Sequence, residues 1–137
     1  MRRFLSALTM SVLCVLVFWV AFATRLLAAG SNETIDRMAK ILLNFTHVPS
    51  VSQKETLQRI LDDTTTTVAE RVVATALMNM EHIVSRDDRP KLEALTRDES
   101  APAAVKTLAS VLNHLTHTPT EVDKETLRQL LQQICSR

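Results

Sequence analysis

Histidine is the residue type in this chain best suited to bind a transition metal, because a neutral imidazole nitrogen is a common ligand for zinc, copper and nickel. The sequence holds 4 histidines, and three of them, His47, His82 and His117, recur at intervals of 35 residues. Neighbouring units of a helical stack lie on the order of 10 Å apart, whereas zinc needs ligand nitrogens about 2 Å away. We therefore expect each of these histidines to cap the last carbonyl groups of a helix and not to share an ion.

A second metal hypothesis uses His114 together with His117. These residues are three positions apart in the chain, which would put both rings on one side of a helix. The chain has no CxxC or Cys/His spacing typical of zinc sites, so the main prediction contains neither a metal site nor a cofactor. The alternative prediction is a small exported protein that binds a metal or another ligand through His114 and His117.

Basic residues form another repeated column, at Lys54, Arg89 and Lys124. The pattern places each of them near the start of a helix, where positive charge interacts unfavourably with the helix dipole. Their recurrence in all three units favours a surface that binds the acidic groups of a partner protein. A solvated face with local ion pairs, or inheritance through repeat duplication, is the alternative.

Two large functional classes find no support in the sequence. No Ser/His/Asp arrangement, phosphate-binding loop or HExxH motif is present, so we predict that the protein is not an enzyme. Of the 16 basic residues, Arg2, Arg3 and Arg25 lie in the first 30 positions, which leaves 13 against 15 acidic residues and a net charge of about −2 for the remainder. A slightly acidic surface does not favour nucleic acid.

A repeat of 35 residues positions these columns along the chain. Apolar residues coincide when the sequence is shifted by that interval, as at Leu42, Leu77 and Leu112. Apolar spacings of three and four residues within each unit, and a composition rich in helix-forming residues, predict helices. We expect six helices, near residues 33–46, 53–62, 67–82, 88–97, 101–116 and 123–134.

The predicted fold is all-α, a short alpha-solenoid of three helical hairpins over residues 31–137. A compact bundle of the same hairpins is the alternative. Capping boxes are expected at Ser52 with Glu55 and at Thr67 with Glu70, because each pair satisfies free N–H groups of a first helical turn. The expected core consists of Leu42, Phe45, Leu57, Leu77, Met80, Leu92, Leu95, Leu112, Leu115 and Leu127.

Several residues of the third unit follow a pattern known from helical repeats. They are Val105, Lys106, Ala109, Leu112, Leu115, Leu127, Leu130 and Leu131. This pattern resembles a HEAT-like repeat of the short kind common in bacteria, and the resemblance extends over residues 35–134. It departs from that family in its period, which is shorter than the usual 40–47 residues, and in Asp36, which stands where Arg71 and Lys106 stand in the later units. The resemblance implies a protein-binding scaffold without catalytic activity.

The first 30 residues form a region of their own. Arg2 and Arg3 precede an apolar run over residues 4–23, which is long enough to span a bilayer. The run fits either a cleaved signal peptide or a retained N-terminal membrane anchor. In both cases the arginine pair stays in the cytoplasm and the helical domain is exported. We therefore expect that domain in the periplasm, or outside the cytoplasm on an inner-membrane anchor formed by residues 4–23.

The end of the chain is a candidate for self-association. Leu131 and Ile134 lie in the last predicted helix and Cys135 directly follows it, with no further helix in the sequence to cover them. They favour a homodimer through the last hairpin. Together, these observations predict a non-enzymatic interaction scaffold, exported or membrane-anchored, whose partner is an unidentified protein.

Overall fold

The computed structural model describes residues 32–136. The predicted leader of residues 1–30, including the apolar run over residues 4–23, lies outside the described residues. None of the helices in the described part combines the length and the apolar character needed to cross a membrane.

All regular elements of the described residues are helices, and there are six of them. The first covers residues 32–43. The other five are α2 (Val51–Asp62), α3 (Val68–Met78), α4 (Arg89–Arg97), α5 (Ala103–His114) and α6 (Glu121–Cys135). The predicted helix count is confirmed. The first helix of each hairpin ends earlier than predicted, at Leu43, Met78 and His114. In each unit the helix therefore stops before the repeated histidine.

Side-chain caps determine where the helices begin. The capping box at Thr67 and Glu70 is confirmed: the Glu70 carboxylate accepts from the Thr67 N–H at 2.8 Å, and the Glu70 N–H donates to the Thr67 hydroxyl at 3.3 Å. The box predicted at Ser52 and Glu55 is wrong. The N-cap is Ser50, whose N–H donates to the Gln53 side chain, so α2 starts two residues earlier than expected.

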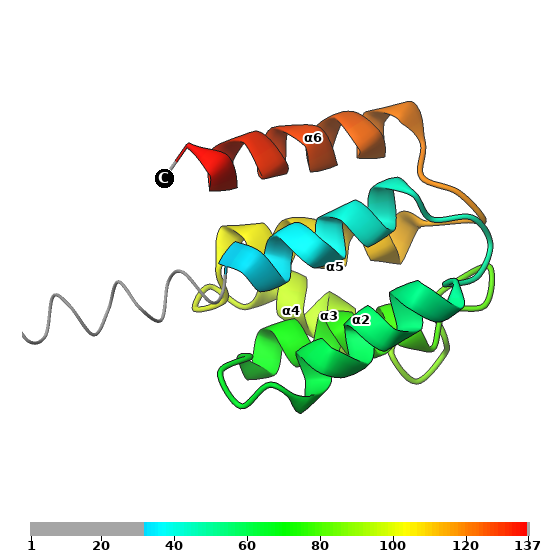
Figure 1. Cartoon of the computed structure of the whole chain (residues 1–137), viewed down its shortest axis with the longest axis horizontal. Coiled ribbons are helices and arrows are strands. Elements are labelled where there is room, and N and C mark those ends of the chain that lie inside the picture. Colours follow the sequence, from blue (N-terminus) through cyan, green and yellow to red (C-terminus); the bar gives the residue numbers. More distant parts are fainter. Residues whose placement is uncertain (1–31, 137) are drawn as a thin grey trace, which may run out of the picture. The chain divides into compact units, whose positions relative to one another are not determined.

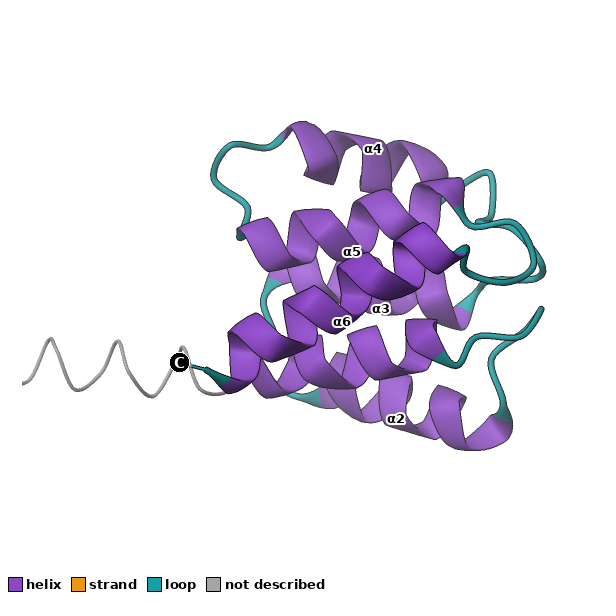
Figure 2. Cartoon of the chain, turned by 90° about the horizontal axis from the view of Figure 1, so that it is seen from above, coloured by secondary structure: helices purple, strands orange, loops and turns teal. Residues whose placement is uncertain are grey.

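The first helix of each hairpin lies inside and the second lies outside. Five residues are buried in each of α3 and α5, compared with two in each of α2, α4 and α6. The helix α3 packs against α2, α4 and α5, and Figure 2 shows α3 and α5 between α2 and α4. Every residue predicted for the core is buried, at 8% exposure or less.

Basic side chains connect the second and the third unit to the preceding unit through hydrogen bonds. The Arg71 guanidinium donates to the carbonyl oxygens of Leu61, Asp63 and Thr66, at the end of the preceding unit. In the third unit, the Lys106 ammonium donates to the Asp98 carbonyl at 3.1 Å. The first unit has no unit before it in the described chain. Asp36 occupies that column instead and forms an ion pair with Lys40 at 2.7 Å, which explains the departure from the repeat pattern.

The solenoid form of the prediction is not confirmed. In an open stack of three units, the first and third units do not touch, whereas here the His47 N–H donates to the His117 carbonyl at 2.9 Å. The chain path in Figure 1 returns the connector before α6 (orange) toward the connector after the first described helix (cyan). The three hairpins therefore close on one another around the histidines.

Candidate metal centre

Each of the three repeated histidines lies in a tight turn just after the first helix of its unit. His47, His82 and His117 have φ angles of 63°, 67° and 65°, and within the described part they are the non-glycine residues with positive φ. In each case the following N–H donates to the carbonyl of the preceding residue, at 2.6, 2.8 and 2.8 Å. A hydrogen bond from residue i+2 to residue i around a positive φ defines a γ-turn of the rare, strained form. Its occurrence at all three equivalent positions makes it part of the repeat.

The backbone of these three residues forms a closed hydrogen-bonded ring. The N–H of His47 donates to the carbonyl of His117 at 2.9 Å, that of His117 to His82 at 2.8 Å, and that of His82 to His47 at 2.7 Å. The γ-turn supplies the reason, because its own hydrogen bond does not use the N–H and C=O groups of the central residue, which are therefore available to other units. Each unit thereby contributes one donor and one acceptor, and the ring has approximate threefold symmetry.

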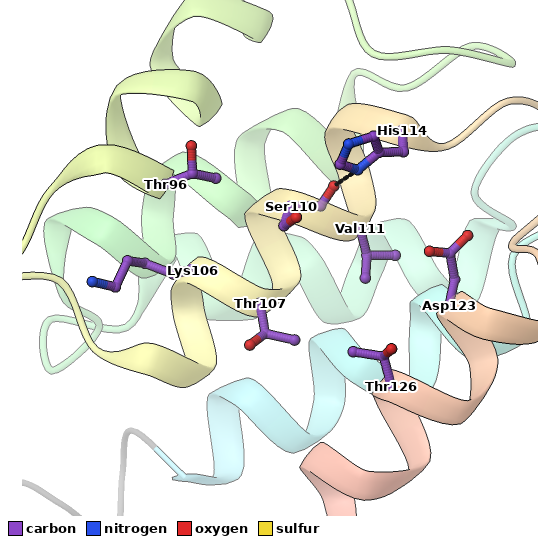
Figure 3. Close-up of a pocket in the computed structure, with 8 residues that line it drawn as sticks. All are labelled: Thr96, Lys106, Thr107, Ser110, Val111, His114, Asp123 and Thr126. Atoms are coloured by element: carbon purple, nitrogen blue, oxygen red, sulfur yellow. Dashed lines mark hydrogen bonds between the residues drawn. The ribbon is translucent and has the colours of Figure 1, made fainter.

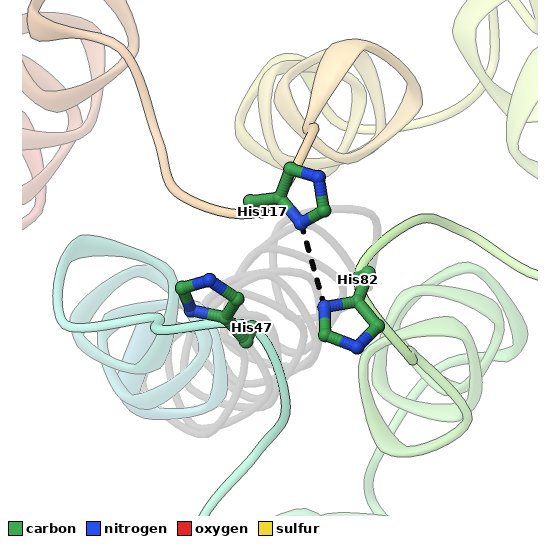
Figure 4. A group of neighbouring side chains, drawn as sticks. All are labelled: His47, His82 and His117. Atoms are coloured by element: carbon green, nitrogen blue, oxygen red, sulfur yellow. Dashed lines mark hydrogen bonds between the residues drawn. The ribbon is translucent and has the colours of Figure 1, made fainter.

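The three imidazole rings converge above this backbone ring, each from a different hairpin (Figure 4). Their centroids are 5.5, 5.4 and 5.3 Å apart. One ring nitrogen from each residue can be chosen so that all three lie within 4.8 Å of one another, and all three side chains are exposed. The Nδ1 atoms of His82 and His117 are 3.4 Å apart. Among the described residues, these three side chains are the group of potential metal ligands whose ligand atoms come close together.

The distance argument against a shared ion is therefore wrong. It took the spacing between helix axes as the spacing between histidines, but the residues lie in connectors that turn inward toward the common axis. The expectation that these histidines cap the last carbonyl groups of their own helices is not what the backbone shows either, because their N–H groups donate to one another's carbonyl oxygens. The signal available in the sequence was the recurrence of histidine in all three copies of one column.

The geometry suits a transition metal. Tetrahedral zinc with Zn–N bonds of 2.0–2.1 Å holds its ligand nitrogens about 3.3 Å from one another. The His82–His117 pair already has a separation of 3.4 Å, and the nitrogens of all three residues lie within 4.8 Å of one another. An ion held by three imidazoles would have further coordination positions, and the three side chains are exposed to solvent.

The basic column lies near the same end of the molecule. Lys54 borders a hollow of about 460 Å³ that is also lined by Glu81 and His82. Lys124 donates to the Glu121 carboxylate at 2.7 Å, and this hydrogen bond lowers the pKa of Glu121. Arg89 is exposed at the first position of α4. The structure does not join these three residues to one another, and binding of an acidic partner by them stays a prediction.

The pair His114 and His117 is divided between two environments. His117 belongs to the cluster described above, whereas the His114 Nδ1 lies 2.6 Å from the Ser110 carbonyl oxygen of its own helix. His114 lines a separate hollow of about 520 Å³ with Thr96, Ser110 and Asp123 (Figure 3). The two side chains therefore do not lie together at one place where they could bind the same metal ion.

The C-terminal residues proposed for self-association are only partly available. Leu131 and Ile134 are half-buried and pack against the main core, while Cys135 is exposed with a free thiol. Homodimer formation through these residues stays a prediction.

Comparison with known proteins identifies no relative: no family model, no curated protein and no solved structure matches this chain. The protein is therefore described by its fold and by its histidine cluster. The described residues form an all-helical domain of six helices in packed pairs, with an exposed cluster of three histidines at one end.

Glycine at position 82 should support folding better than alanine. With φ near 67°, a Cβ atom is unfavourable by roughly 1 kcal/mol, whereas glycine adopts this conformation freely. We expect His82→Gly to have a higher free energy of unfolding in urea than His82→Ala. At Thr75, inside α3, we expect the opposite order, with Thr75→Ala more stable than Thr75→Gly, because alanine is favoured over glycine in a helix by about 1 kcal/mol. A more stable alanine variant at position 82 would contradict the left-handed turn.

Proposed function

We propose that this chain is an exported or membrane-anchored, non-enzymatic protein that binds one divalent transition-metal ion through His47, His82 and His117. The observation that carries the proposal is the placement of three imidazole nitrogens within 4.8 Å of one another, although the residues are separated by 35 positions each in the chain. Export is proposed from the sequence pattern of the first 30 residues.

Backbone geometry supports a functional role for this cluster. Strained backbone conformations cost on the order of 1–3 kcal/mol each and persist where the surrounding structure enforces them, often at functional sites. Here the same strained turn occurs at each histidine. The closed backbone ring holds all three residues in place before any ligand arrives, and such preorganisation favours metal binding over a chance surface cluster.

The donor set restricts the kind of ion. Imidazole nitrogens suit zinc, copper, nickel and cobalt, whereas calcium and magnesium require oxygen ligands. The three nitrogens arise from residues in the first, second and third units, so a bound ion would cross-link all three hairpins. The proposed role is therefore metal binding with a structural consequence for the ring of hairpins.

Titration of the full-length chain with zinc chloride in mild detergent tests this proposal. We expect one class of sites in the wild type and an affinity loss of at least about 100-fold in His82→Gly, since even outer-shell substitutions reduce metal affinity by about 10–100-fold. Glycine is chosen because it tolerates the positive φ of this turn. Lowering the pH from 7 to 5 should weaken binding, because protons compete for the imidazole nitrogens.

The matched control is His114→Ala, which removes a histidine outside the cluster. Its zinc affinity should equal that of the wild type. Equal losses in both variants, or zinc binding by the wild type that His82→Gly leaves unchanged, would overturn the proposal.

A further inference from the structure

The three histidines supply only one side of a coordination sphere. All three side chains are exposed to solvent, so further ligands can reach an ion held between them. A metal that accepts six ligands, such as cobalt(II) or nickel(II), would have three positions left over. This inference rests on the proposed function, because it asks what fills the positions that the cluster leaves open.

Exposed apolar side chains lie on the chain segments next to the cluster, and we call them the apolar rim. We use the term histidine end for the three connectors that carry the histidines, residues 44–50, 79–88 and 115–120, with the first turns of the helices that follow. Five large hydrophobic residues are exposed in the described part of the chain, and four of them lie at the histidine end. These are Val48, Ile83, Val51 and Val122, with exposures of 47%, 49%, 77% and 76%.

The location of these residues links the apolar rim to the metal site. Val48 and Ile83 directly follow His47 and His82, and Val51 is the first residue of α2. The fifth exposed residue, Val68, is the first residue of α3, whose other end leads to His82. It therefore lies about one helix length away, roughly 15 Å. Exposed apolar side chains beside a polar centre exclude water when a partner covers both.

Charge at the histidine end is mixed. Basic and acidic residues are equally frequent there, namely Lys54, Arg86, Arg89, Lys91 and Lys124 against Glu81, Asp87, Asp88, Glu121 and Asp123. Two identical surfaces that carry charge of one sign repel each other. A surface on which both signs are equally represented can pair with its own copy, which favours a second copy of this chain as the occupant.

We infer that two copies of this chain pair through their histidine ends and share one metal ion between them. Each copy contributes His47, His82 and His117, so the ion has six imidazole ligands. A twofold axis perpendicular to the approximate threefold axis of the cluster brings the two sets of nitrogens to opposite sides of one ion. The site of a single chain is incomplete in this arrangement, and the ratio is one ion for two chains.

Cobalt(II) provides the test, because its absorption distinguishes coordination number: four-coordinate cobalt absorbs visible light strongly and six-coordinate cobalt weakly. The full-length chain in mild detergent is titrated with cobalt chloride and measured by native mass spectrometry and visible absorption. We expect two chains per cobalt, weak absorption, and a return to monomers after addition of EDTA.

Two matched variants separate the pairing from the metal binding. Val51→Glu introduces a charge into the rim, and Val68→Glu introduces the same charge at the same helical position of α3, far from the rim. Both valines are highly exposed, at 77% and 81%, so neither substitution disturbs the core. We expect Val51→Glu to bind cobalt as a monomer, one ion per chain, and Val68→Glu to behave as the wild type.

Each further outcome has a definite reading. A wild-type monomer with one cobalt per chain would overturn the shared site and leave the proposed metal binding intact. Absence of cobalt and zinc binding would overturn both. A dimer that persists in EDTA and in His82→Gly would show that pairing does not depend on the ion, and would overturn the inference as well.

Discussion

Saturating zinc should raise the free energy of unfolding of this protein by about 4 kcal/mol when the free ion is present at roughly 1,000 times its dissociation constant. The reason is that the binding site exists only in the folded state: the three histidines are separated by 35 residues each in the chain, and folding brings their rings to 5.3–5.5 Å. An ion that binds all three joins the first unit to the third. Urea unfolding with and without zinc measures this difference.

The control for zinc stabilisation is His82→Gly, in which a 100-fold or greater loss of affinity should reduce the stabilisation from about 4 to about 1.4 kcal/mol or less at the same zinc concentration. The His114→Ala variant should retain the full effect. Equal stabilisation of His82→Gly and the wild type would place the ion elsewhere and contradict the three-histidine site.

Replacement of Leu77 by alanine should lower the free energy of unfolding by about 2–5 kcal/mol, as truncation of a buried leucine does in other cores. Leu77 is 0% exposed and lies on α3, the helix that packs against α2, α4 and α5. The substitution would therefore leave a cavity between α3 and the three helices that pack against it. The neighbouring side chains have little freedom there to collapse into the cavity. Chemical denaturation in urea measures the loss.

The matched control for this core substitution is Val68→Ala, on the same helix but 81% exposed. Its effect should stay within about 0.5 kcal/mol, which is typical of surface positions. A loss at Leu77 no larger than that at Val68 would mean that α3 is not central to the core.

The sequence by itself determined the local structure of this protein. Apolar residues at helical spacing, and side chains such as Thr67 and Glu70 that cap their own helix, act over a few residues, so their effect can be read from the chain. The predicted helices and the entire predicted core are confirmed. The error in the first capping box, Ser50 in place of Ser52, is a choice between two serines two positions apart, which local pattern does not resolve.

Only the tertiary structure decided how the three hairpins meet. The same hairpins fit an open stack or a closed arrangement, because the apolar pattern records which side of each helix is buried and not the angle between units. The closure depends on hydrogen bonds between His47, His82 and His117, which are distant in sequence, and on a left-handed turn that histidine adopts without any local signal in the chain. The histidine column was visible in the sequence from the start. Its meaning as a cluster followed only when the connectors turned inward and brought the three rings to a common axis.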